Sequence, residues 1–189
     1  MANIIVSQFV TLDGVMEDPG GSDGMPRGGW AFKFQRGPEG DRFKMDELAA
    51  AEALLLGRTT YEGFAAAWPS RSGDGFAEKI NTMPKYVVSR TLQRADWNNS
   101  TIIRGDVATE VSELKRRLTG PILINGSGQL VKTLIEHGLV DELRLMVYPT
   151  VLGAGKRMFE PGSKNVSFRL VSAQPMGECL TVIYAPKEG

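Results

Sequence analysis

The sequence has little of what several classes of protein require. It contains one cysteine, Cys179, and one histidine, His137, which excludes an internal disulfide and leaves a zinc site poorly supplied. Basic and acidic residues are equal at 22 each, so no excess of charge favours nucleic acid or an anionic membrane as a partner. A Gly-x-Ser-x-Gly motif is also absent, which disfavours a serine hydrolase. The composition therefore predicts neither a metal site nor a nucleic-acid-binding surface.

Long apolar runs are missing as well. No run approaches the length of a membrane span, and residues 1–10 have neither the charged flank nor the cleavage site of a signal peptide. We therefore expect a cytoplasmic protein without a membrane partner. The length of 189 residues fits a single domain, residues 1–189, with one core.

The stretch 122–138 joins a predicted buried strand, a glycine turn and a helix. Residues 122–125 are mostly apolar, a Gly-Ser-Gly turn follows, and apolar residues then recur at helical spacing. Glycines let the backbone approach a ligand, and the free N–H groups at a helix start favour an anion, so the stretch predicts a phosphate site. The same glycines would also serve only to tighten the turn. The residues of this predicted loop are Gly126, Ser127, Gly128, Gln129 and Leu130.

A second strand of the same kind precedes it. Residues 53–56 form a predicted strand that runs into Gly57 and then a helix, for which Thr59 or Thr60 is the predicted N-cap. Arg58 lies between Gly57 and Thr59, and its planar guanidinium suits bidentate contact with a phosphate.

A third predicted strand, 85–89, ends in the hydroxyl of Ser89 and the guanidinium of Arg90. Ligands of open α/β sheets bind beyond the carboxyl ends of the strands, where all these residues would meet. The two glycine loops would hold a pyrophosphate, and the two arginines would hold a further phosphate. NADPH carries both groups, so the residues predict an NADPH site. The third glycine of a Rossmann fingerprint and a Gly-Lys-Ser/Thr loop are both absent.

Strands alternate with helices through the middle of the chain, and the end of the chain is all strand. This order predicts an α/β fold with a mainly parallel sheet, helices on both faces and an antiparallel C-terminal edge. The remaining predicted strands are 3–10, 101–104, 141–147, 168–172 and 180–185, and the remaining helices are 41–52, 76–81 and one capped by Asp106.

Residues 17–41 form a long predicted loop with seven glycines and three prolines. Such loops are usually functional or disordered, and the aromatic residues Trp30, Phe32 and Phe34 favour a lid over a pocket. A loop that packs its own aromatic residues on the surface is an equal alternative. Candidate proton donors near the expected pocket are the acids Asp13, Asp41, Asp46 and Glu47, each of which could also be a solvated surface group.

Six motifs occur in order along the chain: Ser7 followed by Leu-Asp-Gly at 12–14, Ala-Leu-Leu-Leu-Gly-Arg-Thr-Thr-Tyr-Glu at 53–62, Val-Val-Ser-Arg at 87–90, Asn-Gly-Ser-Gly at 125–128, Gly-Leu-Val-Asp-Glu-Leu at 138–143 and Leu-Gly-Ala-Gly at 152–155. Together they resemble the bacterial dihydrofolate reductase-like family, and in particular the C-terminal reductase domain of the riboflavin-biosynthesis protein RibD. The likeness covers nearly the full length. RibD proteins often have Glu-Gly-Gly where this chain has Asn125-Gly126-Ser127, so the resemblance does not fix the riboflavin-pathway substrate.

The resemblance implies a sheet of about eight strands, an NADPH site and usually a homodimer. It implies that residues 57–60 and 126–130 surround the pyrophosphate and that Ser89 and Arg90 contact the 2′-phosphate. By the same resemblance, the segment after Asp13 covers the nicotinamide, and Asp41 or Asp46 is the helix acid that faces the substrate.

The sequence thus supports one main hypothesis and two alternatives. The main one is an NADPH-dependent reductase that passes hydride to a C=N or C=O carbon of a small heterocyclic substrate, bound near Asp13 under the loop with Trp30 and Phe34. One alternative is a protein that binds or senses NADPH without turnover. The other is a flavin- or tetrapyrrole-binding module, which only the aromatic loop supports.

Overall fold

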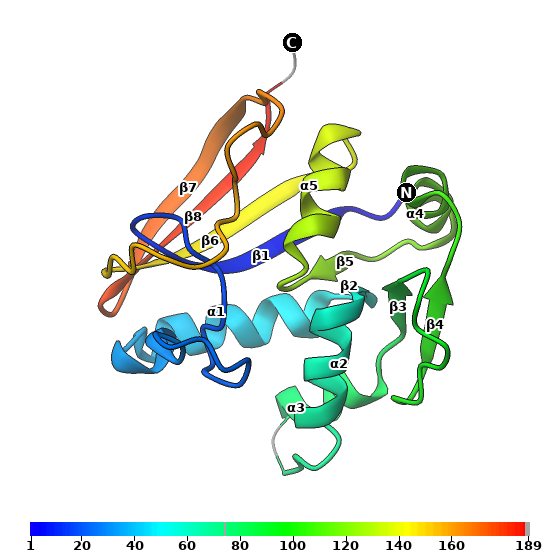
Figure 1. Cartoon of the computed structure of the whole chain (residues 1–189), viewed down its shortest axis with the longest axis horizontal. Coiled ribbons are helices and arrows are strands. Elements are labelled where there is room, and N and C mark those ends of the chain that lie inside the picture. The colour runs from blue at the N-terminus through cyan, green and yellow to red at the C-terminus, as the bar shows by residue number, and fades with distance from the viewer. Residues whose placement is uncertain (74, 188–189) are drawn as a thin grey trace.

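The structure is a computed structural model that describes residues 1–73 and 75–187. The described residues form one eight-stranded sheet in the order β4-β3-β2-β5-β1-β6-β8-β7 (Figure 1). The strands are β1 (Ile4–Thr11), β2 (Ala53–Gly57), β3 (Lys85–Val88), β4 (Ser100–Ile103), β5 (Ile122–Ile124), β6 (Glu142–Tyr148), β7 (Phe168–Met176) and β8 (Cys179–Pro186). The helices are η1, a 3-10 helix (Trp30–Lys33), α1 (Gly37–Ala50), α2 (Arg58–Ala67), α3 (Gly75–Thr82), α4 (Val107–Arg117) and α5 (Gly128–Glu136).

The sheet is parallel except at one strand. All neighbours from β4 to β6 are parallel, and β8 is antiparallel to both β6 and β7. The predicted fold class, a mainly parallel sheet with an antiparallel C-terminal edge, is therefore confirmed. The carboxyl ends of β2, β3, β4, β5 and β1 consequently lie along one edge of the sheet, which is where ligand sites form in such folds.

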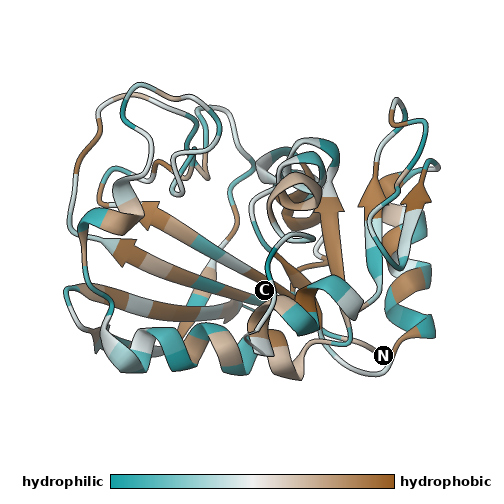
Figure 2. Ribbon diagram, turned by 90° about the horizontal axis from the view of Figure 1, so that it is seen from below, coloured by the Kyte–Doolittle hydropathy of each residue, from teal (hydrophilic) through white to brown (hydrophobic). Residues whose placement is uncertain are grey.

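Helices cover both faces of the sheet because successive strand residues point in opposite directions. Ile4 and Val6 of β1 belong to a core cluster with α4 and α5, whereas Ile5 belongs to a second cluster with α1, α2 and α3. Figure 2 shows much of the sheet coloured as hydrophobic and the helices in mixed colours. Such strands, apolar on both faces, are typical of parallel sheets buried between helices.

Two helix starts differ from the prediction. Helix α1 begins at Gly37, before the predicted start at 41, because Pro38 provides the fixed φ that suits a first turn. Helix α2 begins at Arg58 after Gly57 as N-cap, so neither Thr59 nor Thr60 is the cap. The cap predicted at Asp106 is confirmed, since its carboxylate accepts the N–H of Thr109.

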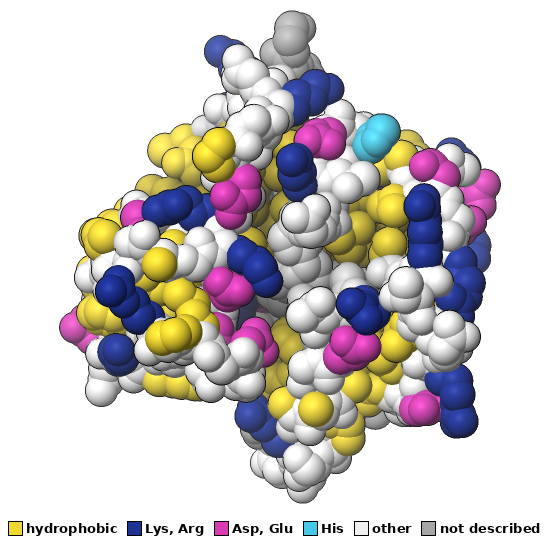
Figure 3. All heavy atoms as spheres, in the orientation of Figure 1, with side chains coloured by type: hydrophobic (Ala, Val, Ile, Leu, Met, Phe, Trp, Pro, Cys, Tyr) yellow, Lys and Arg dark blue, Asp and Glu magenta, His cyan; other side chains and the backbone are white. Residues whose placement is uncertain are grey.

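No helix in the described part of the chain is long and apolar enough to cross a membrane. On the face shown in Figure 3, basic and acidic side chains are interspersed, in keeping with the equal numbers of the two in the sequence.

Candidate functional site

Two hydrogen bonds join the loop after β5 to the loop after β2. The hydroxyl of Ser127 accepts the N–H of Gly57 at 2.9 Å, and the N–H of Ser127 donates to Oγ1 of Thr60 at 2.9 Å. Ser127 has φ 59°, a left-handed conformation that costs energy for a residue with a side chain. The structure thus brings together the two glycine loops that the sequence singled out.

Gly126 is the tightest point of this contact. Its φ is 60°, and a Cβ atom there would lie 2.7 Å from Oγ1 of Thr60, so only glycine fits. The side-chain amide of Gln8 holds the same residue from β1: it donates to the Gly126 carbonyl at 2.5 Å and accepts the Gly126 N–H at 3.1 Å. The result is a fixed backbone turn beside the start of α5.

The loop after β3 lies next to the loop after β2, because Gly57 and Val88 are register partners. Ser89 is buried, and its hydroxyl oxygen accepts the N–H groups of Thr91 at 3.2 Å and Leu92 at 2.9 Å. The side chains of Arg58 and Arg90 are exposed at the same edge. Thr59 and Gln129 are exposed too, whereas Leu130 is in the core, so only the backbone of Leu130 faces the loop.

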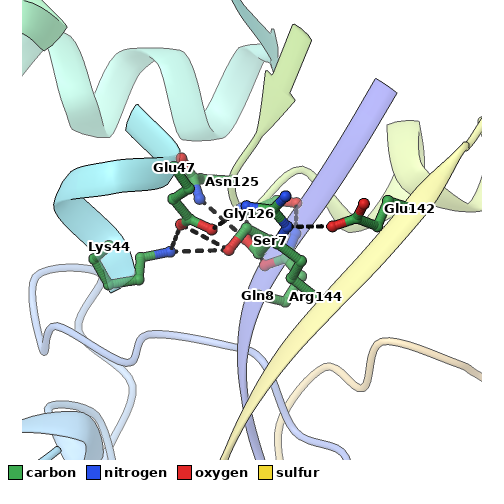
Figure 4. A network of polar contacts seen from close by, with 8 residues as sticks. All are labelled: Ser7, Gln8, Lys44, Glu47, Asn125, Gly126, Glu142 and Arg144. Carbon is green, nitrogen blue, oxygen red and sulfur yellow. Dashed lines mark hydrogen bonds and ion pairs between the residues drawn. The ribbon is translucent and has the colours of Figure 1, made fainter. Parts of the chain in front are cut away.

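A buried network of charges lies beside these loops, between α1 and strands β1 and β6 (Figure 4). Lys44 and Glu47 come from α1, and Ser7 and Arg144 are register partners on the two strands. The ammonium of Lys44 donates to Oε1 of Glu47 and, at 2.9 Å, to the hydroxyl of Ser7, which itself donates to Oε1 of Glu47 at 2.9 Å. Asn125 links the network to the β5 loop by donating to the Ser7 carbonyl at 3.0 Å.

Burial makes this network energetically sensitive. The Glu47 side chain is 1% exposed and that of Lys44 11%. Oε2 of Glu47 has no hydrogen-bond partner among the described residues, and Nη1 of Arg144 lies 3.7 Å from it. Burial lowers the pKa of Lys44, and the neighbouring Glu47 carboxylate opposes that shift. A lysine with a lowered pKa beside an underused carboxylate oxygen is suited to passing a proton.

The acids Asp41 and Asp46 lie outside this network. Asp41 is on the exposed side of α1, 66% exposed and paired with Arg36 at 2.6 Å. Asp46 is exposed as well. Each residue turns a helix by about 100°, so Asp46 points away from the sheet where Glu47 points toward it. Among the acids of α1 considered in the sequence, only Glu47 faces the interior.

The carboxylate of Asp13 accepts hydrogen bonds from neighbouring residues of the protein. Its carboxylate accepts the hydroxyl of Thr11 at 2.6 Å and the N–H groups of Leu152 at 3.2 Å and Gly153 at 2.8 Å. Arg157 lies 3.6 Å away. The hydroxyl of Thr11, followed by the N–H groups of Gly153 and Leu152, lowers the pKa of Asp13 to about 2 against an opposing effect of burial. Asp13 therefore fixes the loop after β6 to the end of β1.

The aromatic residues of the loop between β1 and α1 divide into buried and exposed ones. Trp30 is 0% exposed, and its ring packs edge-on against Tyr148 with centroids 5.3 Å apart, while its Nε1 donates to the carbonyl of Glu17 at 2.9 Å. Phe34 is half-buried against the same tyrosine at 6.3 Å, and Phe32 is 82% exposed. Trp30 thus anchors the loop from beneath rather than presenting a ring face to a ligand.

No group of three or more potential metal-ligating His, Cys, Asp or Glu side chains occurs within residues 1–73 and 75–187. The turns that could hold a ligand are the two joined glycine loops and the loop at Ser89, all at the carboxyl edge of a mainly parallel sheet. This sheet order is that of the dihydrofolate reductase-like α/β fold. The model of the RibD C-terminal domain family matches residues 2–182, and the chain belongs to that family.

Comparisons with individual proteins agree with this assignment. The Bacillus subtilis protein YyaP, itself uncharacterized, is 30% identical over 176 residues, which cover 90% of this chain and 87% of YyaP. A putative riboflavin biosynthesis protein from Shewanella has a similar structure, with a TM-score of 0.78 at 19% identity over 100% of both chains. Dihydrofolate reductase from Enterococcus faecalis, in complex with NADP(H), has a TM-score of 0.60 at 15% identity over 98% of this chain and 97% of its own.

Proposed function

We propose that this protein is an NADPH-dependent reductase that adds hydride to a C=N or C=O carbon of a small pyrimidine- or pteridine-like substrate. The observation that carries the proposal is the position of the buried Lys44–Glu47 pair beside the joined glycine loops after β2 and β5. A place for an anionic cofactor and a source of protons thus adjoin one another. Membership of the RibD C-terminal domain family and the similar fold of an enzyme bound to NADP(H) support it.

The geometry of the loops fits a dinucleotide. Glycine at 126 lets the β5 loop pack closely against Thr60 of the β2 loop, and the start of α5 beside it favours negative charge. When bound, the reduced nicotinamide would supply the hydride. The residues proposed to hold the cofactor are Gly57, Arg58, Thr59 and Thr60 after β2, Ser89 and Arg90 after β3, and Gly126, Ser127, Gly128, Gln129 and Leu130 after β5.

The proton needed with the hydride is proposed to come from Lys44. Glu47 accepts hydrogen bonds from Lys44 and Ser7 and lies near Arg144, so its carboxylate is better placed to hold the ammonium than to give up a proton. The ammonium proton passes to the substrate nitrogen or oxygen, and water returns a proton to Lys44. This assignment replaces Asp41 and Asp46, because both are exposed.

The substrate is proposed to lie between α1 and the loop that precedes it. Phe34 is half-buried there, and Phe9 of β1 lies beneath the ammonium of Lys44, 5.1 Å from its ring centroid. Aromatic rings suit a flat heterocycle. Trp30 and Asp13 would act through the loops that they fix.

We also propose a homodimer formed through the C-terminal strands. Edge strand β7 exposes Leu170 by 57% and Val171 by 51%, and Leu180 of β8 is 42% exposed. Exposed apolar side chains on an unpaired edge favour association. Light scattering should give twice the chain mass for the wild type and the single chain mass for Leu170→Lys; a monomeric wild type would exclude the dimer.

The first test is calorimetric titration with NADPH, NADP⁺ and NADH. We expect the phosphorylated cofactors to bind at least tenfold more tightly than NADH, which is about 1.4 kcal/mol. Oxidation of NADPH is then followed at 340 nm with a panel of pterins and pyrimidines, comparing the wild type with Lys44→Met. Failure of all three cofactors to bind would reject the reductase. Binding without oxidation of NADPH by any member of the panel would favour the sensing alternative.

A further inference from the structure

Three neighbouring strand ends form one row at the proposed cofactor edge. Gly57 of β2 pairs with Val88 of β3, which pairs with Ile103 of β4. The residues that follow this row are Arg58, Ser89 and Arg104. Arg58 and Ser89 are already proposed to contact the cofactor, and Arg104 lies at the same level one strand further out.

The guanidinium of Arg104 is directed at the backbone of the loop after β3. Its Nη2 donates to the carbonyl of Leu92 at 2.7 Å and to that of Gln93 at 3.4 Å, and its Nη1 donates to the carbonyl of Arg90 at 3.4 Å. Three carbonyl groups of one short turn therefore point toward a single fork of donors. Lysine could not reproduce this geometry, because an ammonium lacks the planar fork.

The same turn presents donors on its other side. The oxygen of Ser89 accepts two backbone N–H groups, from Thr91 and Leu92, and its hydroxyl proton has no acceptor in the described part of the chain. The residue is only 8% exposed. Because both lone pairs of the oxygen are used, the hydroxyl can act toward a ligand only as a donor, which is what a phosphate requires.

Carbonyl oxygens that faced a phosphate dianion would repel it. By holding the carbonyls of residues 90, 92 and 93, Arg104 keeps these partial negative charges away from the ligand side of the turn. We infer that Arg104 is a positioning residue that sets the preference for a 2′-phosphorylated cofactor, by fixing the turn from which Ser89 and Arg90 donate. This inference rests on the proposed function, because it presumes that a dinucleotide occupies this edge.

The test is the ratio of the dissociation constants for NADH and NADPH, measured by calorimetry at one fixed ionic strength. We expect Arg104→Met to lower this ratio about fivefold or more, while the affinity for NADH changes less than twofold. Arg104→Lys should lower the ratio as well, since it retains the charge but loses the fork. A thermal melt of each variant confirms folding.

Arg94→Met is the matched control. Arg94 lies in the same loop and is exposed, but its guanidinium pairs with Asp96 at 2.9 Å and contacts none of the three carbonyls. Its removal should leave the ratio unchanged; an equal fall would show that only the general positive charge matters and would overturn the inference. Full retention of the ratio in Arg104→Lys would overturn it too.

The failure of the inference differs from the failure of the proposed function. A wild type that prefers NADPH, with an Arg104→Met variant that keeps the same preference, removes the role of Arg104 alone. A wild type that binds neither cofactor removes both.

Discussion

The N–H of Ser127 donates a 2.9 Å hydrogen bond to the hydroxyl oxygen of Thr60, 67 residues earlier in the chain. These residues come from the two glycine loops that the sequence predicted to hold one pyrophosphate. The bond makes the loops one unit, so a change in either loop is expected to alter the other.

Thr60→Val tests this coupling, because it keeps the shape of the side chain and removes the acceptor. The N–H of Ser127 would lose its partner, and we expect a loss of about 1–2 kcal/mol in the free energy of unfolding. NADPH binding should weaken at the same time, since the β5 loop is no longer fixed. Urea unfolding and calorimetry measure the two effects. Thr59→Val, at an exposed position, should leave the free energy of unfolding unchanged; an equal loss there would contradict the coupling.

The Lys44–Glu47 pair should behave as a coupled unit in a double-mutant cycle. Lys44→Met leaves the buried Glu47 carboxylate without its main cation, and we expect it to cost about 3 kcal/mol of stability. Glu47→Gln combined with Lys44→Met should cost less than the sum of the two single changes by about 1–2 kcal/mol. Urea unfolding of the four proteins gives these values.

Lys33→Met serves as the control for the loss of one positive charge, because Lys33 is exposed. Additive single changes within experimental error would show that Lys44 and Glu47 do not interact.

The lowered pKa of Asp13 predicts that the free energy of unfolding falls in acid. Its pKa in the folded protein is about 2, below the ordinary value of 3.8, so the unfolded chain binds more protons between these values. The stability that the Asp13 carboxylate provides is therefore fully present above about pH 4 and is lost as the pH falls toward 2. Relative to Asp13→Asn, the wild type should lose about 1–2 kcal/mol over this range.

Urea unfolding at several pH values measures that difference. Asp46→Asn, at an exposed position, is the control for the loss of one carboxylate. A difference between Asp13→Asn and the wild type that stays constant with pH would contradict the hydrogen-bonded role of Asp13.

We expect Trp30 to hold the loop between β1 and α1 in place. Trp30→Ala removes a fully buried ring, and we expect a loss of about 3–5 kcal/mol together with proteolytic cleavage within residues 17–36. Trp30→Phe should retain most of the packing and lose the hydrogen bond to Glu17, at a cost of about 1 kcal/mol. Urea unfolding and limited proteolysis with mass spectrometry measure both effects. Phe32→Ala, 82% exposed in the same turn, should match the wild type.

Local pattern predicted the elements well where hydrophobic periodicity was strong. The strands β1, β3 and β6 lie within a few residues of their predicted bounds, the cap at Asp106 is confirmed, and the two C-terminal strands pair as the predicted antiparallel edge. The predicted start of α1 at residue 41 was wrong. Gly37 and Gly40 indicated a loop, although the helix includes both. The N-cap of α2 was wrong because Thr60 is used instead by Ser127, a contact that no local pattern contains.

The candidate site was harder to predict than the fold. Glu47 stood among the candidate acids, but sequence alone gave no reason to separate it from Asp46, its exposed neighbour. Ser7 contributed to the family resemblance without an assigned role, and Lys44 and Arg144 gave no signal, because each is an ordinary residue of its own element. Their importance comes from the pairing of β1 with β6 and from the face of α1 that covers both strands.

The sequence by itself determined the alternation of strands and helices and the glycine turns after β2 and β5, because each depends on residues close together in the chain. It also determined the lack of excess charge, which is a property of composition alone. The tertiary structure alone decided that Thr60 meets Ser127, that Arg104 holds the turn after Ser89, and that Glu47 of α1 is buried while Asp41 and Asp46 are exposed. The physical reason is distance along the chain. Burial and hydrogen bonding between remote residues depend on strand order and register, which the side chains of the whole sheet fix together.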